Sequence, residues 1–359
     1  MSVPDNSLIN DIRSPSQFKG ITFSKYKRTD VRDQLLKNLC NGKIEPACYW
    51  SAELICAGHF MELWEAIIHY VGKHIHLGNP KLIIYLEMRF NIFRNIMSQG
   101  HFMHEIELRN NDKIRRLFAE IISTISLSNK KHSFESIKIN RVEEFDITLM
   151  TDRFKAPSIK YIDGIFKKGD PKELYVAINE FAYNISPDGS NMRTACYWIE
   201  WVIEFELICK KRKETTFCER RIVPVESKFQ KDLIWLIWDC LLKYSEERNN
   251  PFIHKIMNSI MSVFCIKYTT GSCKKRRYLL YFAVALLTEP VPTTIEIVSN
   301  KIMIQNVVEN INETYKQIKK NEDSPNTEYL FSNLDKKQTF EESVRRMELL
   351  QSVDFANEN

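Results

Sequence analysis

Apolar residues recur at every third or fourth position along most of this 359-residue chain, and this spacing restricts it to a helical fold. In the clearest stretch, one helical face carries Phe60, Leu63, Trp64, Ile67, Ile68 and Val71. The same spacing predicts further helices at about 81–97, 114–125, 198–208, 233–242, 256–264, 278–287 and 304–318. We therefore predict an all-α protein.

The block Ala-Cys-Tyr-Trp occurs twice, at 47–50 and at 195–198, each time at the start of an amphipathic stretch. The recurrence predicts two related helical units, with Tyr49, Trp50, Tyr197 and Trp198 in a repeated structural role. Between the blocks, residues 131–168 lose the helical spacing and alternate apolar with polar residues, which predicts an extended or β-hairpin connector. We expect the second unit, residues 169–320, to begin with Asp170 as a helix cap.

Both ends of the chain differ from its body. We predict a flexible arm over residues 1–27, before the first unit at 28–130, and a flexible tail over the polar residues 321–359. Near the end of the tail, Thr339-Phe340-Glu341-Glu342 forms a capping box before Val344, Met347 and Leu350 at helical spacing. Two interpretations stay open: this short helix packs back on the body, or it docks into a partner's groove through Val344, Met347 and Leu350.

Composition limits the environment more than the function. The net charge of +5 permits a nucleic-acid partner without requiring one. The longest apolar runs, near 235–242 and 279–287, are too short to cross a bilayer, so we expect no membrane association. The nine cysteines are scattered among apolar neighbours, which is typical of reduced, buried thiols in an intracellular protein.

The first block belongs to a longer ordered series. Ala57-Gly58 follows it, then the apolar helix through Trp64, then Ile75-His76-Leu77-Gly78-Asn79-Pro80. Residues 45–82 thereby resemble the C-terminal helical collar of clamp-loader-like ATPases related to replication-associated recombination protein A. The corresponding positions are Tyr49, Trp50, Gly58, Ile75, Leu77 and Pro80. The resemblance implies a collar that holds subunits together, and therefore protein partners and an oligomer.

The chain departs from that family in two ways. Lys73-His74 replaces the family's acidic pair, and His76 replaces a glycine. The sequence also contains no Gly-x-x-x-x-Gly-Lys-Ser/Thr motif, so the loop that cradles phosphates in those ATPases is missing. We expect the collar part alone, without ATP hydrolysis.

The whole chain also resembles an uncharacterised protein family of giant nucleocytoplasmic DNA viruses. The segments that carry this resemblance are 47–80, 131–135, 229–232 and 273–278. It implies no particular activity, but it points to virus replication or virion assembly, in the host cytoplasm, at a viral replication site, in the nucleus or in the virion.

Positive charge gathers in three runs of the second unit: Lys210-Lys211-Arg212-Lys213, Arg220-Arg221 and Lys274-Lys275-Arg276-Arg277. If their loops meet, they form a patch that neutralises phosphates, with Phe217, Phe229 and Tyr278 nearby to stack on bases. The alternative is solvated loop charge beside acidic segments.

Other chemistry has weaker support. The histidines at 69, 74, 76, 101 and 104 and the cysteines at 40, 48, 56, 196, 209 and 218 lack the spacing of a metal site, so we expect no metal and no cofactor. No local nucleophile and base pattern occurs either. We therefore expect a non-enzymatic accessory factor of replication or assembly, which binds protein through the collar-like unit and DNA or RNA through the basic loops. The alternative is an internal virion structural or scaffold protein.

Overall fold

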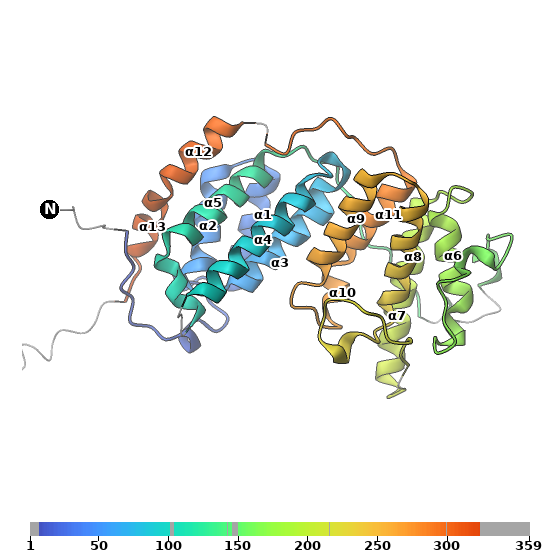
Figure 1. The fold of residues 1–359 in the computed structure, drawn as a ribbon. Helices are drawn as coiled ribbons and strands as arrows, with labels where there is room; N and C mark the ends of the chain where they lie inside the picture. The colour runs from blue at the N-terminus through green and yellow to red at the C-terminus, as the bar shows by residue number, and fades with distance from the viewer. Residues whose placement is uncertain are drawn as a thin grey trace, which may run out of the picture.

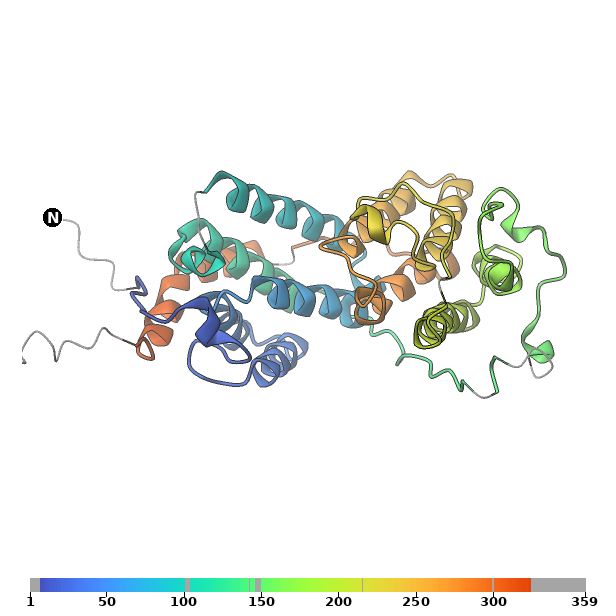
Figure 2. The same cartoon turned by 90° about the horizontal axis from the view of Figure 1, so that it is seen from below.

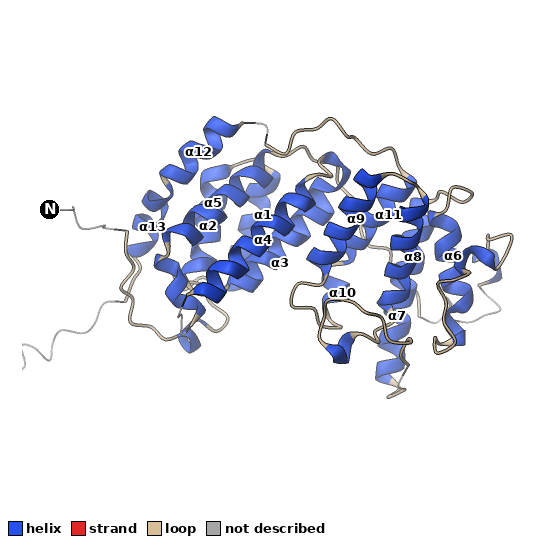
Figure 3. Cartoon of the chain, in the orientation of Figure 1, coloured by secondary structure: helices blue, strands red, loops and turns tan. Residues whose placement is uncertain are grey.

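The computed structural model describes residues 7–100, 104–141, 143–145, 150–214, 216–298 and 300–323. These residues contain thirteen α-helices and no β-strand. The prediction of an all-α fold is confirmed (Figure 3). The first unit contains α1 (Arg28–Cys40), α2 (Ile44–Cys56), α3 (Phe60–Tyr70), α4 (Leu82–Gln99) and α5 (Asp112–Leu127). The second contains α6 (Tyr175–Ile185), α7 (Met192–Lys211), α8 (Ile234–Glu247), α9 (Pro251–Phe264), α10 (Ser272–Lys275) and α11 (Arg277–Thr288).

The two units lie side by side and repeat one pattern of helix contacts (Figure 1). In the first unit, α1 packs along α2, and both contact α3 and α5, while α4 packs on α5. In the second, α6 packs along α7, and both contact α8 and α11, while α9 packs on α11. Each Ala-Cys-Tyr-Trp block begins at the fourth residue of the second helix of its hairpin.

Positions beyond the repeated block follow the same correspondence. Trp64, the dipeptide 79–80 (Asn-Pro) and Phe93 recur 171 positions later as Trp235, the dipeptide 250–251 and Phe264. The ring centroids of Trp64 and Phe93 are 5.8 Å apart, and those of Trp235 and Phe264 are 6.1 Å apart. Equivalent residues thus make equivalent contacts in the two units.

Helices α4 and α9, which correspond to each other, pack together where the units meet. Helix α11 adds a second contact, with the π-helical segment Val71–Ile75 that continues α3. The contact is close, because a Cβ atom on Gly72 would lie 3.1 Å from the carbonyl carbon of Tyr278. A side chain at this position would therefore push the units apart.

Both ends of the described chain belong to the first unit, which differs from the predicted boundaries. Helices α12 (Lys301–Glu309) and α13 (Ile311–Lys319) return across the molecule and pack on α2 and α5, as Figures 1 and 2 show. Residues 7–27 are not a loose arm, because Phe18 and Phe23 are fully buried and the backbone of Ile9 bonds to Asn110. The tail residues Val344, Met347 and Leu350 lie outside the described residues.

The segment between the units has little regular structure. Residues 129–141 run without helix or strand, and their start is fixed by hydrogen bonds from Lys131 N to Ile75 O and from Ser133 N to Lys73 O. Among the described residues, no helix is long and apolar enough to cross a membrane.

Within the resemblance to a clamp-loader collar, Gly58 has a clear local role. It follows the last residue of α2 by two positions and has a φ of +77°, a left-handed conformation that favours glycine at helix ends. Pro80 lies in the turn that precedes α4. Both positions shape connections between helices.

Candidate nucleic-acid interface

A cleft of about 850 Å³ opens between the two units, where the start of α1 and helix α3 face the chain from Lys267 to Tyr278. Six cationic side chains and two carboxylates line it. The cations are Arg28, Arg32, Lys267, Lys274, Lys275 and Arg277, and the carboxylates are Glu62 and Glu65. We call this the basic cleft.

Both carboxylates of the basic cleft are already neutralised. Arg28 Nε lies 2.5 Å from Glu62 Oε2, and Glu65 forms an ion pair with the buried Arg276. Burial also raises the pKa of Glu62, against the opposing effect of Arg28. Arg28 is thereby balanced as well, and Arg277 is balanced by Glu200, so the positive charge that the cleft presents to solvent comes from Arg32, Lys267, Lys274 and Lys275.

Several of the cations remain available to a ligand. Lys274 is more than half exposed, and its ion pair with Glu204, at 3.6 Å, is weak enough for a stronger anion to replace the carboxylate. Lys275 is exposed, and Arg32 Nε is buried without a hydrogen-bond partner in the part of the chain that the structure describes.

The titration of His69, which also lines the cleft, reports the same positive environment. Its pKa falls from 6.5 to about 4, first because of burial and then because Arg32 and Lys73 repel the added charge. At neutral pH this ring is uncharged. The hydroxyl groups of Thr29, Ser136, Thr269 and Ser272 complete the polar lining and can donate to phosphate oxygens.

The three predicted basic runs are only partly brought together. Lys274 and Lys275 lie in the basic cleft, while the exposed residues Lys211, Arg212 and Lys213 lie at the end of α7. Lys210 pairs with Glu206 at 3.4 Å, and Lys274 of α10 pairs with Glu204 of α7 at 3.6 Å. Helix α10 therefore lies beside α7, whose last turn carries this basic run.

Two of the predicted contact residues are internal. Arg221, only 3 % exposed, forms ion pairs with Asp170 at 2.7 Å and Asp239 at 2.6 Å. Arg276, 2 % exposed, donates to the carbonyl of Phe264 as well as to Glu65. Burial removes both from the proposed interface.

The remaining members of those two runs differ. Arg277 is mostly covered and pairs with Glu200 at 3.2 Å, although it reaches the lining of the basic cleft. Arg220 is exposed and donates to Gln230 at 2.6 Å. Short basic runs thus divide between surface and core.

The expected cap at Asp170 is a related correction. Its carboxylate accepts from the backbone N–H groups of Lys167 and Glu219 and from the guanidinium of Arg221, so it holds a loop and caps no helix. Burial alone would raise its pKa, but these hydrogen bonds and the charge of Arg221 lower it instead. The α-helix itself begins later, at Tyr175.

Of the three aromatic residues expected to stack on bases, Phe229 and Tyr278 already pack against other side chains. The Phe229 ring packs edge-on against Tyr268 at 5.7 Å. Tyr278 lies below Lys73 Nζ, at 5.2 Å, with His69 at its edge. Phe217 is half exposed and remains accessible.

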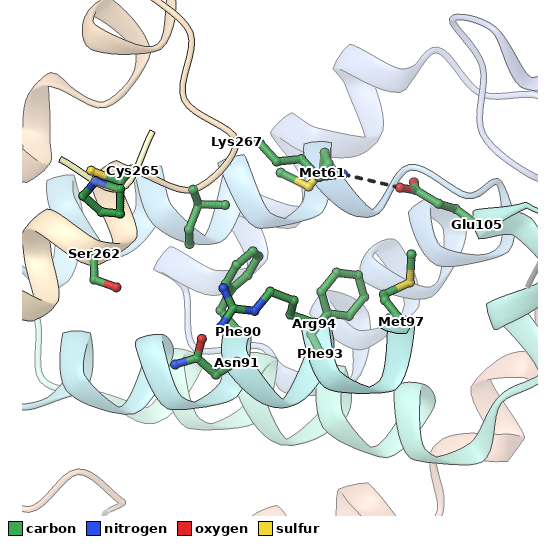
Figure 4. Close-up of a pocket in the computed structure, with 12 residues that line it drawn as sticks. Met61, Phe90, Asn91, Phe93, Arg94, Met97, Glu105, Ser262, Cys265 and Lys267 are labelled. Atoms are coloured by element: carbon green, nitrogen blue, oxygen red, sulfur yellow. Dashed lines mark ion pairs between the residues drawn. The ribbon is translucent and has the colours of Figure 1, made fainter. Parts of the chain in front are cut away.

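A second, smaller cavity of about 360 Å³ adjoins the basic cleft, and the two share Met61 and Lys267 as lining residues. Figure 4 shows its aromatic and thioether side chains on α3 and α4, opposite Ser262 of α9 and Cys265 at the end of that helix. We call it the apolar pocket. An ion pair of 3.6 Å between Lys267 and Glu105 links the two units beside it.

Neither histidines nor cysteines assemble into a metal site within the described residues. Nδ1 of His74 lies 3.0 Å from Nδ1 of His132, and one of these nitrogens donates to the other. All nine cysteines are free, and burial raises the pKa of thiols such as Cys48 and Cys265 to about 12. Such thiols are poor nucleophiles and poor metal ligands.

The sequence did not identify Arg28, Arg32 or Lys267 as site residues, because each is an isolated charge far from the predicted runs. One signal was present: Arg28 and Arg32 are four residues apart and therefore lie on one face of a helix. Two like charges on one face repel, and that cost suggests a functional reason. Comparison of the chain with protein families, curated proteins and solved structures found no match.

Proposed function

We propose that this protein is a non-enzymatic nucleic-acid-binding accessory factor, acting in replication or assembly inside a cell infected by a large DNA virus. The observation that carries the binding role is the basic cleft, where six cations from both units surround two neutralised carboxylates. The viral assignment rests on the sequence resemblance alone.

A cleft built in this way suits a phosphate backbone better than a single small anion. Its cations come from separate elements, namely α1, the loop after α9, and the α10 region, so they are spread along the cleft. Helix α10 also lies beside α7, whose last turn carries a further basic run. Such a track can neutralise several phosphates in succession.

The test is fluorescence anisotropy of the full chain with single-stranded DNA, duplex DNA and RNA over a series of salt concentrations. We expect affinity to fall steeply with salt, and the variant Lys267→Gln/Lys274→Gln/Lys275→Gln to show a shallower slope. Each lost phosphate contact should reduce the slope by about 0.7 on single strands or about 0.9 on duplex DNA.

A matched control removes the same charge elsewhere, with Lys19→Gln/Lys168→Gln/Lys172→Gln at three exposed positions outside the cleft lining. The control should bind like the wild type. An equal loss in both variants would mean that net charge alone drives binding, and no binding by the wild type would favour a scaffold role.

The protein-binding part of the proposal has its own support. A groove of about 690 Å³ lies between α2 and the returning helices α12 and α13, and Tyr49 and Trp50 of the first repeated block line it. Partly exposed aromatic residues are enriched at protein interfaces. This is the face through which we propose that the collar-like unit binds protein.

A further inference from the structure

We infer that the apolar pocket receives a single unstacked nucleobase from a strand whose phosphates follow the basic cleft, so that the protein binds single strands in preference to duplexes. This inference rests on the proposed function. It adds the kind of nucleic acid and the place where a base is held.

The first step is the continuity of the two cavities. Met61 and Lys267 belong to the lining of both, so the two cavities adjoin at these side chains. Lys267 lies at this junction, with its side chain 63 % exposed. A phosphate bound there would place its own base at the entrance of the pocket.

The second step is the chemistry of the walls. Phe90 and Phe93 of α4, with Met61 and Met97, supply an apolar surface of rings and thioethers (Figure 4). Phe93 is only 5 % exposed, so Phe90 is the ring that remains partly open to a base, and it is held edge-on against Trp64 at 5.1 Å. Stacking against a fixed aromatic wall suits any base, since every base presents a π-face.

The third step is the polar edge of the same pocket. Asn91, Arg94, Glu105 and Ser262 line it. Glu105 pairs with Lys267 at 3.6 Å, and among the described residues Arg94 forms no ion pair and Asn91 no side-chain hydrogen bond. An amide both donates and accepts, and a guanidinium stacks on or donates to a base. The pocket thus offers free donors and acceptors to the edge of a base.

Geometry then selects a single strand. In a duplex the bases are stacked and paired, and extruding one costs a few kcal/mol, whereas a single strand presents its bases freely. The groove beside Trp50 is a poor alternative, because its lining includes Glu45 and Glu313 and no lysine or arginine. Of the basic cleft, this groove and the apolar pocket, the last is the cavity that combines an apolar space with an adjoining positive track.

The deciding experiment compares a single-stranded oligonucleotide with an abasic oligomer of the same length, both titrated with the full chain. The two carry the same phosphate charge and differ only in their bases. We expect the normal strand to bind about tenfold more tightly, the scale of one stacked base, with the same salt slope. Equal affinities would overturn the inference while leaving the proposed function intact, whereas no binding by either strand would remove both.

Two variants locate the effect. Ser262→Leu fills the pocket, and Asn91→Ala removes its amide; each should reduce the preference for the normal strand and leave abasic binding unchanged. The matched control is Asn95→Ala, an exposed position one turn further along α4 that does not line the pocket. Thermal midpoints check that each variant folds, and Asn91→Ala remains informative if Ser262→Leu does not.

A free mononucleotide provides the last arm. Competition by a mononucleotide as effective as that by the oligonucleotide would assign the pocket to free nucleotides and overturn the assignment to a strand. The assignment to a strand is supported if the mononucleotide competes much more weakly than the oligonucleotide, because a mononucleotide cannot contact the row of cations along the cleft.

Discussion

The two Ala-Cys-Tyr-Trp blocks occupy equivalent helices yet have different surroundings. In α7, Tyr197 is 5 % exposed and Trp198 is fully buried. In α2, Tyr49 and Trp50 are half-buried and line a groove. The same four residues therefore start the same kind of helix but do not decide what covers it.

The covering segments explain the difference. In the second unit the connector lies over the block, with the Arg153 guanidinium 4.6 Å from the Tyr197 ring and Phe154 stacked on Trp198 at 6.3 Å. In the first unit Tyr26, itself 46 % exposed, is the ring from outside α2 that packs on Trp50 among the described residues, at 5.8 Å. A segment distant in the sequence covers one block, whereas the other lines a groove.

The largest expected effect comes from replacing each of the two tryptophans, Trp198 and Trp50, with alanine. Trp198→Ala should lower the free energy of unfolding by about 3–5 kcal/mol, because it leaves a large cavity in the core. Trp50→Ala should cost clearly less, since solvent and neighbouring side chains can fill a site that is already partly open. Urea unfolding of both variants gives the comparison, and equal losses would show that the groove beside Trp50 is closed in solution.

Two buried groups, His76 in the first unit and Glu206 in the second, should make stability respond to pH in opposite directions. Burial lowers the pKa of His76 in the first unit to about 4, and burial raises the pKa of Glu206 in the second to about 7. The fold favours the neutral form of each group. As pH falls from 6.5 to 4, His76 is protonated first in the unfolded chain, so the folded state loses stability. As pH rises from 4.5 to 7, Glu206 ionises first in the unfolded chain, and again the folded state loses stability.

Each group should contribute a slope of at most about 1.4 kcal/mol per pH unit within its range. His76→Asn should reduce the loss of stability as pH falls from 6.5 to 4. Glu206→Gln should reduce the loss of stability as pH rises from 4.5 to 7. Unfolding midpoints measured from pH 4 to 8 test both. The assignments fail if either substitution only shifts the curve without changing its slope.

Local sequence predicted the helices well because apolar spacing is itself the cause of helix burial, as in the helix through Trp64 and Ile67. It could not predict that α12 and α13 return to the first unit, because amphipathic spacing shows that a face is buried and not what buries it. For the same reason, the sequence could not show that the second repeated block is buried more completely than the first.

The candidate site shows the same limit for charge. Lys274 and Arg276 are near neighbours in one run, and the sequence treats them alike. The structure turns one toward the basic cleft and the other toward Glu65 and a carbonyl in the core. Their distinct roles depend on partners about two hundred positions away, as does the contribution of Arg28 and Arg32.

The smallest predicted effect tests the correspondence itself. Trp64 and Phe93 are 29 positions apart, as are Trp235 and Phe264, and both ring pairs are in contact. Double-mutant cycles with leucine replacements should give coupling energies of about 0.5–1.5 kcal/mol in each unit, similar to one another. Similar couplings are expected because both pairs join the helix after the hairpin to the helix at the interface between the units. A coupling in one unit and none in the other would mean that the matching spacing does not reflect matching structure. The two units would then share the order of their helices without sharing the packing of their side chains.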